Sequence, residues 1–366
     1  MDANGTSMRA ARWHAALDVR VEDVPVPRPG PGDVLIRVER AGICGTDLEE
    51  YVAGPVSIPV GWPHPISGRQ APLILGHELV GTVEAGPMAG ARVVPNVVVG
   101  CGRCWWCVRR QEMLCPKLGV RGLNDDGGFA EFIVAEADTC VPVPEYVDPD
   151  VAAFAEPVSV AIHALSKAEP LAGRVVAVNG AGVIGQLVVQ LALAGGAVAV
   201  LAVDPVRVRR ELARHWGAQA CPPDEAPERM AALSGGRGAD VVLECSGVRG
   251  ALASTIELSR PGGTVVVVGI HAGTEQIPLL PLVLEERHLV GSAGHLWDVD
   301  VASAVALLSR GTLDVLPLRS AVVPLAKVVT DGFERLRTDK DVFKILVDPS
   351  PEGVDGAGDD QRDGHQ

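Results

Sequence analysis

The sequence predicts a protein of class α/β plus β, in which a doubly wound parallel α/β domain is inserted into a β-rich domain. From residue 9 to about residue 136 the apolar runs are short and broken by proline and glycine, as in a β-rich fold. From Arg174 onward, longer apolar runs alternate with segments of helical length, which indicates a parallel sheet. The chain has 366 residues, enough for two hydrophobic cores.

The β-rich part is predicted to begin with short strands joined by loops. A long segment over 55–72 contains several prolines, and loops of this length are commonly functional. The expected strands are 34–38, 81–83, 92–94 and 129–134.

The α/β part is predicted to continue to about residue 295, after which the chain returns to the first domain. The expected strands are 174–179, 197–204, 240–244, 264–268 and 288–291, with helices over 183–194 and 205–216. A helix over 299–309 and strands near Val322 and over 344–347 complete the chain. Residues 1–7 and 351–366 are polar or rich in glycine and aspartate, and we expect them to be disordered tails.

Composition limits the classes of partner. The formal net charge is -14, which disfavours binding to nucleic acid and to anionic membranes. No apolar run is long enough for a transmembrane helix, and no secretory signal is apparent. We therefore expect a cytoplasmic protein with neither nucleic acid nor a membrane as partner.

Four of the eight cysteines fall within fifteen residues. Four thiolates with this spacing can close a tetrahedron around one zinc ion and leave no open position, so the site is predicted to be structural. Free thiols or disulfides are the alternative, and a cytosolic compartment disfavours disulfides. The four are Cys101, Cys104, Cys107 and Cys115.

The run Gly180-Ala-Gly-Val-Ile-Gly185 follows a predicted strand and begins a predicted helix. Such glycines allow a tight turn and a close approach to a pyrophosphate at the helix N-terminus. Asp204 ends the next strand, where a carboxylate accepts hydrogen bonds from a ribose and favours NAD over NADP, although nearby arginines weaken that preference. The candidate cofactor-binding residues are Gly180, Gly182, Val183, Ile184, Gly185, Asp204 and Arg209.

A second group of metal-binding residue types is dispersed along the chain. Cys44 lies in Gly42-Ile-Cys-Gly-Thr-Asp47, His77 and Glu78 follow an apolar run, and Glu156 lies where the β-rich part ends. One cysteine, one histidine and one glutamate would leave the fourth position of zinc open, as a catalytic site requires. Spacing alone does not join these residues, and a cysteine before a glycine is commonly a small buried residue.

From about Met8 to Asp348 the chain resembles the zinc-containing medium-chain alcohol dehydrogenases. The resemblance rests on the motifs just described, and the loop from Tyr51 to His77 is most similar to the 2,3-butanediol dehydrogenase branch, followed by the polyol and sorbitol dehydrogenases. It implies a GroES-like catalytic domain over 8–160 that holds both zinc sites. It also implies a Rossmann domain over 161–295 and a return to the catalytic domain over 296–348.

The resemblance also implies roles for individual residues. Cys44, His77 and Glu156 would bind the catalytic zinc, with Glu78 as a nearby carboxylate able to replace water on the metal. Thr46 would take the proton of the substrate hydroxyl. Glu49 stands where many relatives carry a histidine that relays this proton, so either Glu49 takes over the relay or the proton leaves by another route. The catalytic candidates are therefore Thr46, Cys44 and Glu49.

The activity implied by the resemblance is the NAD(H)-linked interconversion of a secondary alcohol and its ketone. The substrate would be a vicinal diol or polyol such as 2,3-butanediol, the protein would hold two zinc ions per chain, and it would be a homodimer or homotetramer. A dehydrogenase of a cyclitol, aminocyclitol or sugar alcohol is an alternative. A non-catalytic binding protein or a zinc-free quinone reductase with the same fold is disfavoured, because every zinc-ligand candidate is present.

Overall fold

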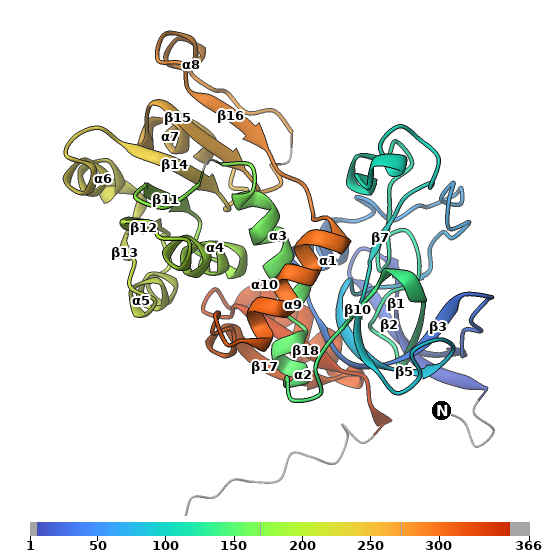
Figure 1. Ribbon diagram of the computed structural model, residues 1–366. Coiled ribbons are helices and arrows are strands. Elements are labelled where there is room, and N and C mark those ends of the chain that lie inside the picture. The colour runs from blue at the N-terminus through green and yellow to red at the C-terminus, as the bar shows by residue number, and fades with distance from the viewer. Residues whose placement is uncertain (1–5, 169, 272, 352–366) are drawn as a thin grey trace, which may run out of the picture.

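The computed structural model describes residues 6–168, 170–271 and 273–351, and Figure 1 shows a β-rich half and an α/β half lying side by side. Most of the two predicted tails, residues 1–5 and 352–366, lies outside the described residues. The expectation of a disordered amino-terminal tail was wrong for Ser7, which begins strand β1 and pairs with Pro25 of β2.

The β-rich half contains a seven-stranded sheet, a three-stranded sheet and a two-stranded sheet of β7 and β8. The seven-stranded sheet has the order β10-β6-β5-β3-β18-β17, with β9 also paired to β3, and the three-stranded sheet has the order β2-β1-β4. The strands are β1 (Ser7–Ala15), β2 (Asp18–Pro25), β3 (Asp33–Gly42), β4 (Leu73–Ile74), β5 (Glu78–Ala85), β6 (Arg92–Pro95), β7 (Val98–Val99), β8 (Gly119–Val120), β9 (Phe132–Glu136), β10 (Cys140–Pro142), β17 (Arg319–Pro324) and β18 (Lys344–Asp348).

The last strands of the chain lie beside the first ones. Strand β18 pairs antiparallel with β3, with Leu346 opposite Gly42 and Val347 opposite Ala41. The remaining helices of the chain outside the α/β sheet are α1 (Gly45–Ala53), α2 (Pro149–Ala152), α3 (Ala155–Leu165), α9 (Ala302–Ser309) and α10 (Glu334–Thr338). This return brings the carboxyl-terminal strand next to the residues that follow β3.

The α/β half is built on a six-stranded, wholly parallel sheet with the order β13-β12-β11-β14-β15-β16. The strand order reverses between β11 and β14, which is where open α/β sheets bind their ligands. The strands are β11 (Val175–Asn179), β12 (Ala199–Val203), β13 (Gln219–Cys221), β14 (Ala239–Glu244), β15 (Ser259–Val267) and β16 (His288–Gly291); the helices are α4 (Val183–Ala194), α5 (Arg207–His215), α6 (Ala226–Ser234), α7 (Ala251–Leu258) and α8 (Leu279–Leu284).

Three clusters of buried apolar side chains form the interior. One fills the β-rich half, and one fills the face of the parallel sheet that α6 and α7 cover. The third extends from the other face of the parallel sheet through α3 and α9 to Val80 of the β-rich half. Helices α3 and α9 therefore join the two halves through a shared core, and Figure 1 shows these helices between the two halves.

Several predicted elements differ at their ends. The strand predicted over 129–134 begins only at Phe132, because the backbone before it pairs with β1 of the other sheet, where Ala11 N donates to Phe129 O at 2.8 Å. The helix predicted over 299–309 begins at Ala302 and follows a π-helical turn, Trp297–Val301. In the described part of the chain, no helix combines the length and apolarity needed to cross a bilayer.

Candidate active site and metal centres

Side chains of Cys44, His77 and Glu78 meet in one cluster, with ligand atoms that all lie within 4.8 Å of one another. Cys44 is the N-cap residue of α1, directly after β3, and Glu78 is the first residue of β5. The antiparallel register of these strands places Gly42 opposite Glu78. The pairing of β3 with β5 therefore joins the two motifs that spacing alone could not connect.

Asp47 fixes the orientation of this cluster. It is fully buried, and its Oδ2 atom accepts a hydrogen bond from Cys44 N at 2.9 Å. Its Oδ1 atom lies 3.4 Å from His77 Nδ1. Burial by itself lowers the pKa of His77, but the carboxylate of Asp47 and the sulfur of Cys44 outweigh burial and hold the pKa well above its usual value. An imidazole held from one side by a carboxylate presents its other nitrogen to a metal.

Glu156 lies in the first turn of α3 and faces the same region, but it is not a member of the 4.8 Å cluster. Burial and the neighbouring Glu78 carboxylate raise the pKa of Glu156 to about 7. Asp47, Glu78 and Glu156 thus gather negative charge around the thiol of Cys44. A divalent cation would neutralise this charge, so the residues present fit a zinc ion.

Lys344, which was not predicted as a site residue, supplies a positive charge at the edge of the cluster. Its Nζ atom lies 2.7 Å from Glu78 Oε2 and donates a hydrogen bond to Ile43 O at 2.9 Å. Burial by itself would lower the pKa of Lys344. Glu78 and Cys44 outweigh burial and hold the pKa of Lys344 above its usual value. The sequence signal that could have identified Lys344 is its place as a single lysine in the apolar strand β18.

The residues of α1 divide into those that face the cluster and those that do not. The Thr46 hydroxyl lies 3.9 Å from Cys44 Sγ. Glu49 is half-buried, and its side chain has no hydrogen bond or ion pair within the described residues. Glu50 is fully buried, and its carboxylate accepts hydrogen bonds from backbone N–H groups including Val56 N at 2.9 Å and Ile58 N at 3.2 Å. Glu50, also missed in the sequence, therefore anchors the start of the long loop.

The cysteine quartet forms a second cluster, with four sulfur atoms within 4.8 Å of one another. Cys107 Sγ lies 3.4 Å from Cys104 Sγ and 4.0 Å from Cys101 Sγ. These separations bracket the edge of about 3.8 Å expected for sulfurs bound to one tetrahedral zinc. Backbone N–H groups lower the pKa of Cys101 to about 6, while burial raises the pKa of Cys107 to about 12. The four residues fit a closed structural zinc site, which also includes Cys115.

The glycine run lies at the carboxyl end of β11, at the reversal of strand order. Gly180 has a φ of +93°, and a Cβ there would meet Ser246 N at 2.7 Å. A Cβ at Gly185 would meet Gly180 O at 1.9 Å, whereas Gly182, the N-cap of α4, has open space around it. The first and third glycines thus permit the turn and its packing, and the second leaves the backbone accessible to a phosphate.

Asp204 organises this glycine turn from the end of β12. It is 2% exposed, and its carboxylate accepts hydrogen bonds from Ala181 N and Val206 N, each at 2.8 Å. Arg209 Nη1 lies 3.7 Å from Asp204 Oδ2. Val183 and Ile184, at the start of α4, are partly exposed. The structure therefore places every predicted cofactor-binding residue around one helix N-terminus.

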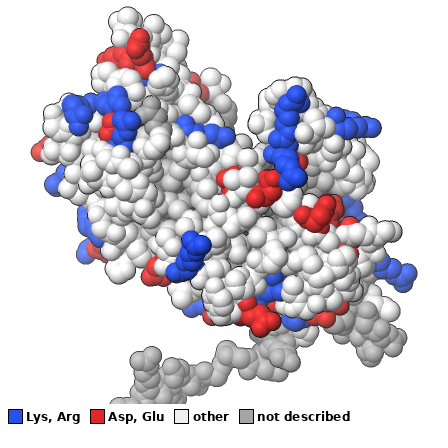
Figure 2. Space-filling model, in the orientation of Figure 1, with Lys and Arg blue, Asp and Glu red and all other residues white. Residues whose placement is uncertain are grey.

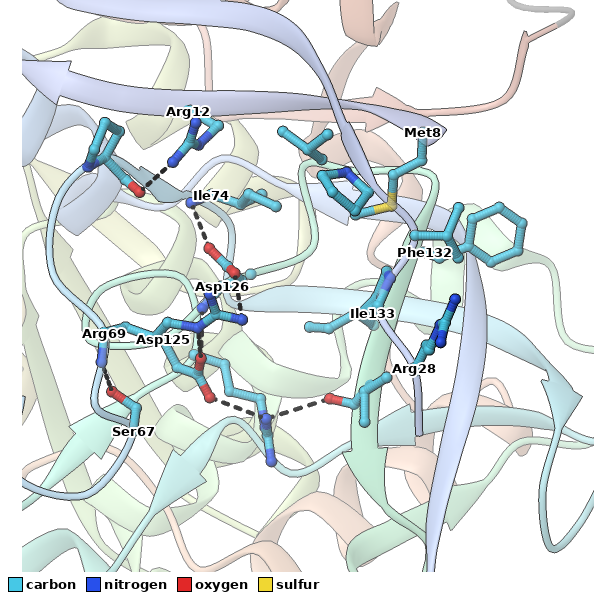
Figure 3. A pocket seen from close by; sticks show the side chains of 18 of the residues that line it. Met8, Arg12, Arg28, Ser67, Arg69, Ile74, Asp125, Asp126, Phe132 and Ile133 are labelled. Atoms are coloured by element: carbon cyan, nitrogen blue, oxygen red, sulfur yellow. Dashed lines mark hydrogen bonds and ion pairs between the residues drawn. The ribbon is translucent and has the colours of Figure 1, made fainter. Parts of the chain in front are cut away.

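A cavity of about 640 Å³ lies elsewhere, on the outer side of the β-rich half. Figure 3 shows Arg69, Asp125 and Asp126 together on one side, and Met8, Phe132 and Ile133 with Arg28 on the other. Arg69 is paired with Asp126 at 3.3 Å, so much of the charge is balanced internally. None of its lining residues belongs to either metal cluster.

The comparisons with known proteins agree with this architecture. Residues 30–145 match the family model described as alcohol dehydrogenase GroES-like domain, and residues 183–310 match the one described as zinc-binding dehydrogenase. The chain is 33% identical over 353 residues to (R,R)-butanediol dehydrogenase of Bacillus subtilis (strain 168), covering 94% of this chain and 100% of that protein. The crystal structure of 2R,3R-butanediol dehydrogenase from Bacillus subtilis superposes with a TM-score of 0.87 at 31% identity and with the same coverage.

Other similar proteins carry different names. L-threonine 3-dehydrogenase of Pyrococcus abyssi is 32% identical over 337 residues, covering 89% of this chain and 94% of that protein. The structure of a putative zinc-binding dehydrogenase from Sinorhizobium meliloti 1021 bound to NADP superposes with a TM-score of 0.83 at 31% identity, covering 94% of this chain and 99% of that one.

A GroES-like domain with a Cys/His/Glu cluster, joined to a Rossmann domain, defines a zinc-dependent oxidoreductase that acts on CH–OH groups. The chain belongs to the zinc-containing medium-chain alcohol dehydrogenase family.

Proposed function

We propose that this enzyme interconverts a secondary alcohol and its ketone with NAD(H), and that the alcohol is a vicinal diol or a polyol such as 2,3-butanediol. The observation that carries the proposal is the Cys44–His77–Glu78 cluster in a chain whose parallel sheet carries the glycine turn. The similarity to butanediol dehydrogenases covers nearly the whole chain and supports this substrate class.

The charge of the site favours a neutral substrate. Asp47, Glu78 and Glu156 surround the reactive region, and His77 and Lys344 are the positive groups that lower the pKa of Glu156. A negatively charged substrate would approach these carboxylates at short range and be repelled. A neutral diol therefore fits better than an anionic substrate. A cyclitol or sugar alcohol is also neutral and remains the second candidate.

Each residue of the cluster has a defined part in the proposed reaction. Cys44 and His77 would hold zinc, with Glu156 or Glu78 as the carboxylate ligand; when bound, zinc lowers the pKa of the alcohol oxygen and NAD⁺ takes up the hydride. Thr46, whose Oγ1 atom lies 3.9 Å from Cys44 Sγ, would accept the hydroxyl proton while passing its own proton on towards the nicotinamide ribose. Asp47 holds His77 in orientation, and Lys344 holds Glu78.

The preferred cofactor is proposed to be NAD. Asp204 directly follows β12, the strand after the glycine turn, where its carboxylate would face the adenosine ribose and repel the extra phosphate of NADP. Arg209 offsets part of this charge at 3.7 Å, and one similar structure is described as bound to NADP. The preference for NAD over NADP therefore depends on whether the negative charge of Asp204 outweighs the positive charge of Arg209.

We further propose that the enzyme is a homo-oligomer, a dimer or a tetramer, assembled through β16 and α8. Strand β16 is an edge strand of the parallel sheet. The adjacent α8 exposes Leu279, Leu280, Val283 and Leu284, each more than 60% exposed. Figure 2 shows mostly uncharged atoms at the tip of this half. Exposed edge strands with apolar surroundings are typical sites of protein association. In a symmetric dimer the same surface of each copy meets the other, so a second copy of this chain can cover this surface.

The enzyme is proposed to act in the cytoplasm. None of the eight cysteines, all within the described residues, forms a disulfide, as is typical of proteins from reducing compartments.

The test is a substrate screen combined with a measurement of bound zinc on the same sample. Vicinal diols, polyols, cyclitols and simple secondary alcohols are offered with NAD⁺ and with NADP⁺. We expect about two zinc ions per chain and the highest kcat/KM on a vicinal diol. Cys44→Ala should abolish NAD-linked oxidation, whereas Cys140→Ala, a buried cysteine outside both clusters, should retain it. Full activity in Cys44→Ala would refute the assignment.

A further inference from the structure

A second imidazole, His295, is buried beside the proposed reactive centre. Its side chain is 2% exposed, and its Nε2 atom lies 3.7 Å from Glu156 Oε1. Neither ring nitrogen has a hydrogen-bond partner within the described residues. Buried polar atoms without partners are rare and cost about 1–3 kcal/mol each, so two on one ring indicate a site that a ligand completes.

The backbone that presents His295 is held in place by Asp300. Asp300 Oδ2 accepts a hydrogen bond from Leu296 N at 2.7 Å and lies 2.8 Å from His163 Nδ1 of α3. Asp300 N in turn donates to Leu296 O at 2.7 Å. Because α3 also carries Glu156, the same helix fixes both the carboxylate and the segment that bears the imidazole.

The cysteine lobe, the segment 101–115 that carries the four clustered cysteines, also contacts the segment that bears His295. Arg110 Nη1 lies 2.8 Å from Asp298 Oδ2. A Cβ at Gly294 would lie 2.5 Å from the Met113 side chain, so the lobe packs directly on the backbone that precedes His295. The ring is therefore confined by two independent elements, as a residue that positions a ligand must be.

The hydrogen-bonding functions of the imidazole limit what it can bind. An imidazole with one ring proton has one N–H donor and one acceptor nitrogen, the same pair of functions that a hydroxyl group offers. A carboxylate could not use the acceptor nitrogen and would also meet Glu156 and Asp300.

From this geometry we infer that His295 binds the second hydroxyl group of a vicinal diol whose first hydroxyl is the one oxidised. The inference rests on the proposed function and adds a residue that selects the substrate. The two oxygens of a vicinal diol are carried by adjacent carbons. With the first oxygen at the Cys44–His77 cluster, we place the second beside the imidazole, because His295 lies 3.7 Å from Glu156 and Glu156 in turn neighbours Glu78 and His77.

The experiment compares a diol with a matched mono-alcohol, 2,3-butanediol against 2-butanol, in the wild type and in His295→Ala. We expect kcat/KM for the diol to fall about tenfold or more, mainly through KM, with a change of less than about threefold for 2-butanol. His295→Asn keeps a donor and an acceptor and should recover part of the loss. His14→Ala, on the outer strand β1, is the control and should leave the ratio of the two substrates unchanged.

A binding measurement provides a readout separate from turnover. The diol is titrated into the enzyme–NADH complex and followed by nicotinamide fluorescence, and His295→Ala should raise the dissociation constant by a similar factor. Bound zinc and the thermal midpoint are measured in each variant. Equal losses on both alcohols, or an unchanged dissociation constant, would overturn the role of His295. Absence of NAD-linked oxidation of every alcohol by the wild type would instead overturn the proposed function, and the inference with it.

Discussion

Lys344 and Glu78 form a buried ion pair, with Nζ 2.7 Å from Oε2, across 266 positions of sequence. The side chains are 5% and 2% exposed, so neither charge has water as an alternative partner. The pair ties the last strand of the chain to the first residue of β5 and holds the carboxylate that stands beside Cys44 and His77.

Removing the lysine should therefore destabilise the protein. In Lys344→Met the Glu78 carboxylate is left buried without its partner, and we expect the free energy of unfolding to fall by about 3–5 kcal/mol, measured by urea denaturation. Lys327→Met removes an exposed lysine and should change it by less than about 0.5 kcal/mol. The double variant Lys344→Met with Glu78→Gln should recover much of the loss; equal losses in single and double variants would contradict the ion-pair explanation.

The cysteine quartet should hold its metal independently of the active site. Cys107→Ser removes one of four thiolates, and bound zinc should fall from about two ions per chain to about one, with a lower thermal midpoint. Cys140→Ser, at a buried cysteine outside the quartet, should keep both ions. Elemental analysis of the purified proteins distinguishes the two; a Cys107→Ser protein with two zinc ions would argue against a tetrahedral site.

Cofactor preference should respond to the charge of Asp204. Asp204→Asn keeps an oxygen that can accept from Ala181 N, but it removes the charge that repels the phosphate of NADP. The ratio of kcat/KM for NAD⁺ to that for NADP⁺ should fall about tenfold or more. Asp224→Asn, an exposed aspartate after β13, serves as the control. An unchanged ratio in Asp204→Asn would remove the contact assigned to this carboxylate.

The apolar surface of α8 should control assembly. Leu280→Glu combined with Val283→Glu places two charges on side chains that are 70% and 71% exposed in the single chain. If a second copy covers them, the charges would be buried at the interface and the oligomer should dissociate, as light scattering would show. Val198→Glu changes another exposed apolar residue, 68% exposed and away from this face, and should leave the mass unchanged. A wild-type monomer would refute the interface.

Acid sensitivity should depend in part on Asp240. Its Oδ2 accepts from Val175 N at 2.8 Å, and its Oδ1 accepts from Arg260 Nε at 2.7 Å. Burial raises the pKa of Asp240, but the Arg260 and Val175 hydrogen bonds lower it more, so the folded-state pKa lies below the usual value. The resulting stabilisation is present above the unfolded-state pKa of about 3.9 and is lost as the pH falls through the folded-state pKa.

Asp240→Asn should consequently lose stability at neutral pH and converge with the wild type in acid. We expect a deficit of about 1–2 kcal/mol at pH 7 and pH 5 that shrinks below about pH 4, measured by denaturant unfolding across the series. Asp138→Asn, at an exposed aspartate, should follow the wild type throughout. A deficit independent of pH would show that packing, not charge, underlies the effect.

Features that depend on neighbouring residues could be predicted from the sequence. The alternation of strands and helices after Arg174, the glycine turn that precedes α4 and the four clustered cysteines all follow from local spacing, and the structure brings each group together as expected. Local spacing was also enough to predict the helix over 183–194 and the strand over 288–291 at their observed ends, because apolar runs of these lengths stand between glycines or charged residues.

The sequence by itself thus determined the fold class, the order of the two domains and the residue types able to bind metal. Only the tertiary structure decided which of these residues meet, because the register of β3 against β5 and the return of β18 set distances that sequence separation does not encode. It placed Glu78 with Cys44 and His77 and left Glu156 beside them, next to His295. Lys344 and His295 could be identified as site residues only from the tertiary structure. A buried charge or an unpaired ring is defined by neighbours that are distant in the chain.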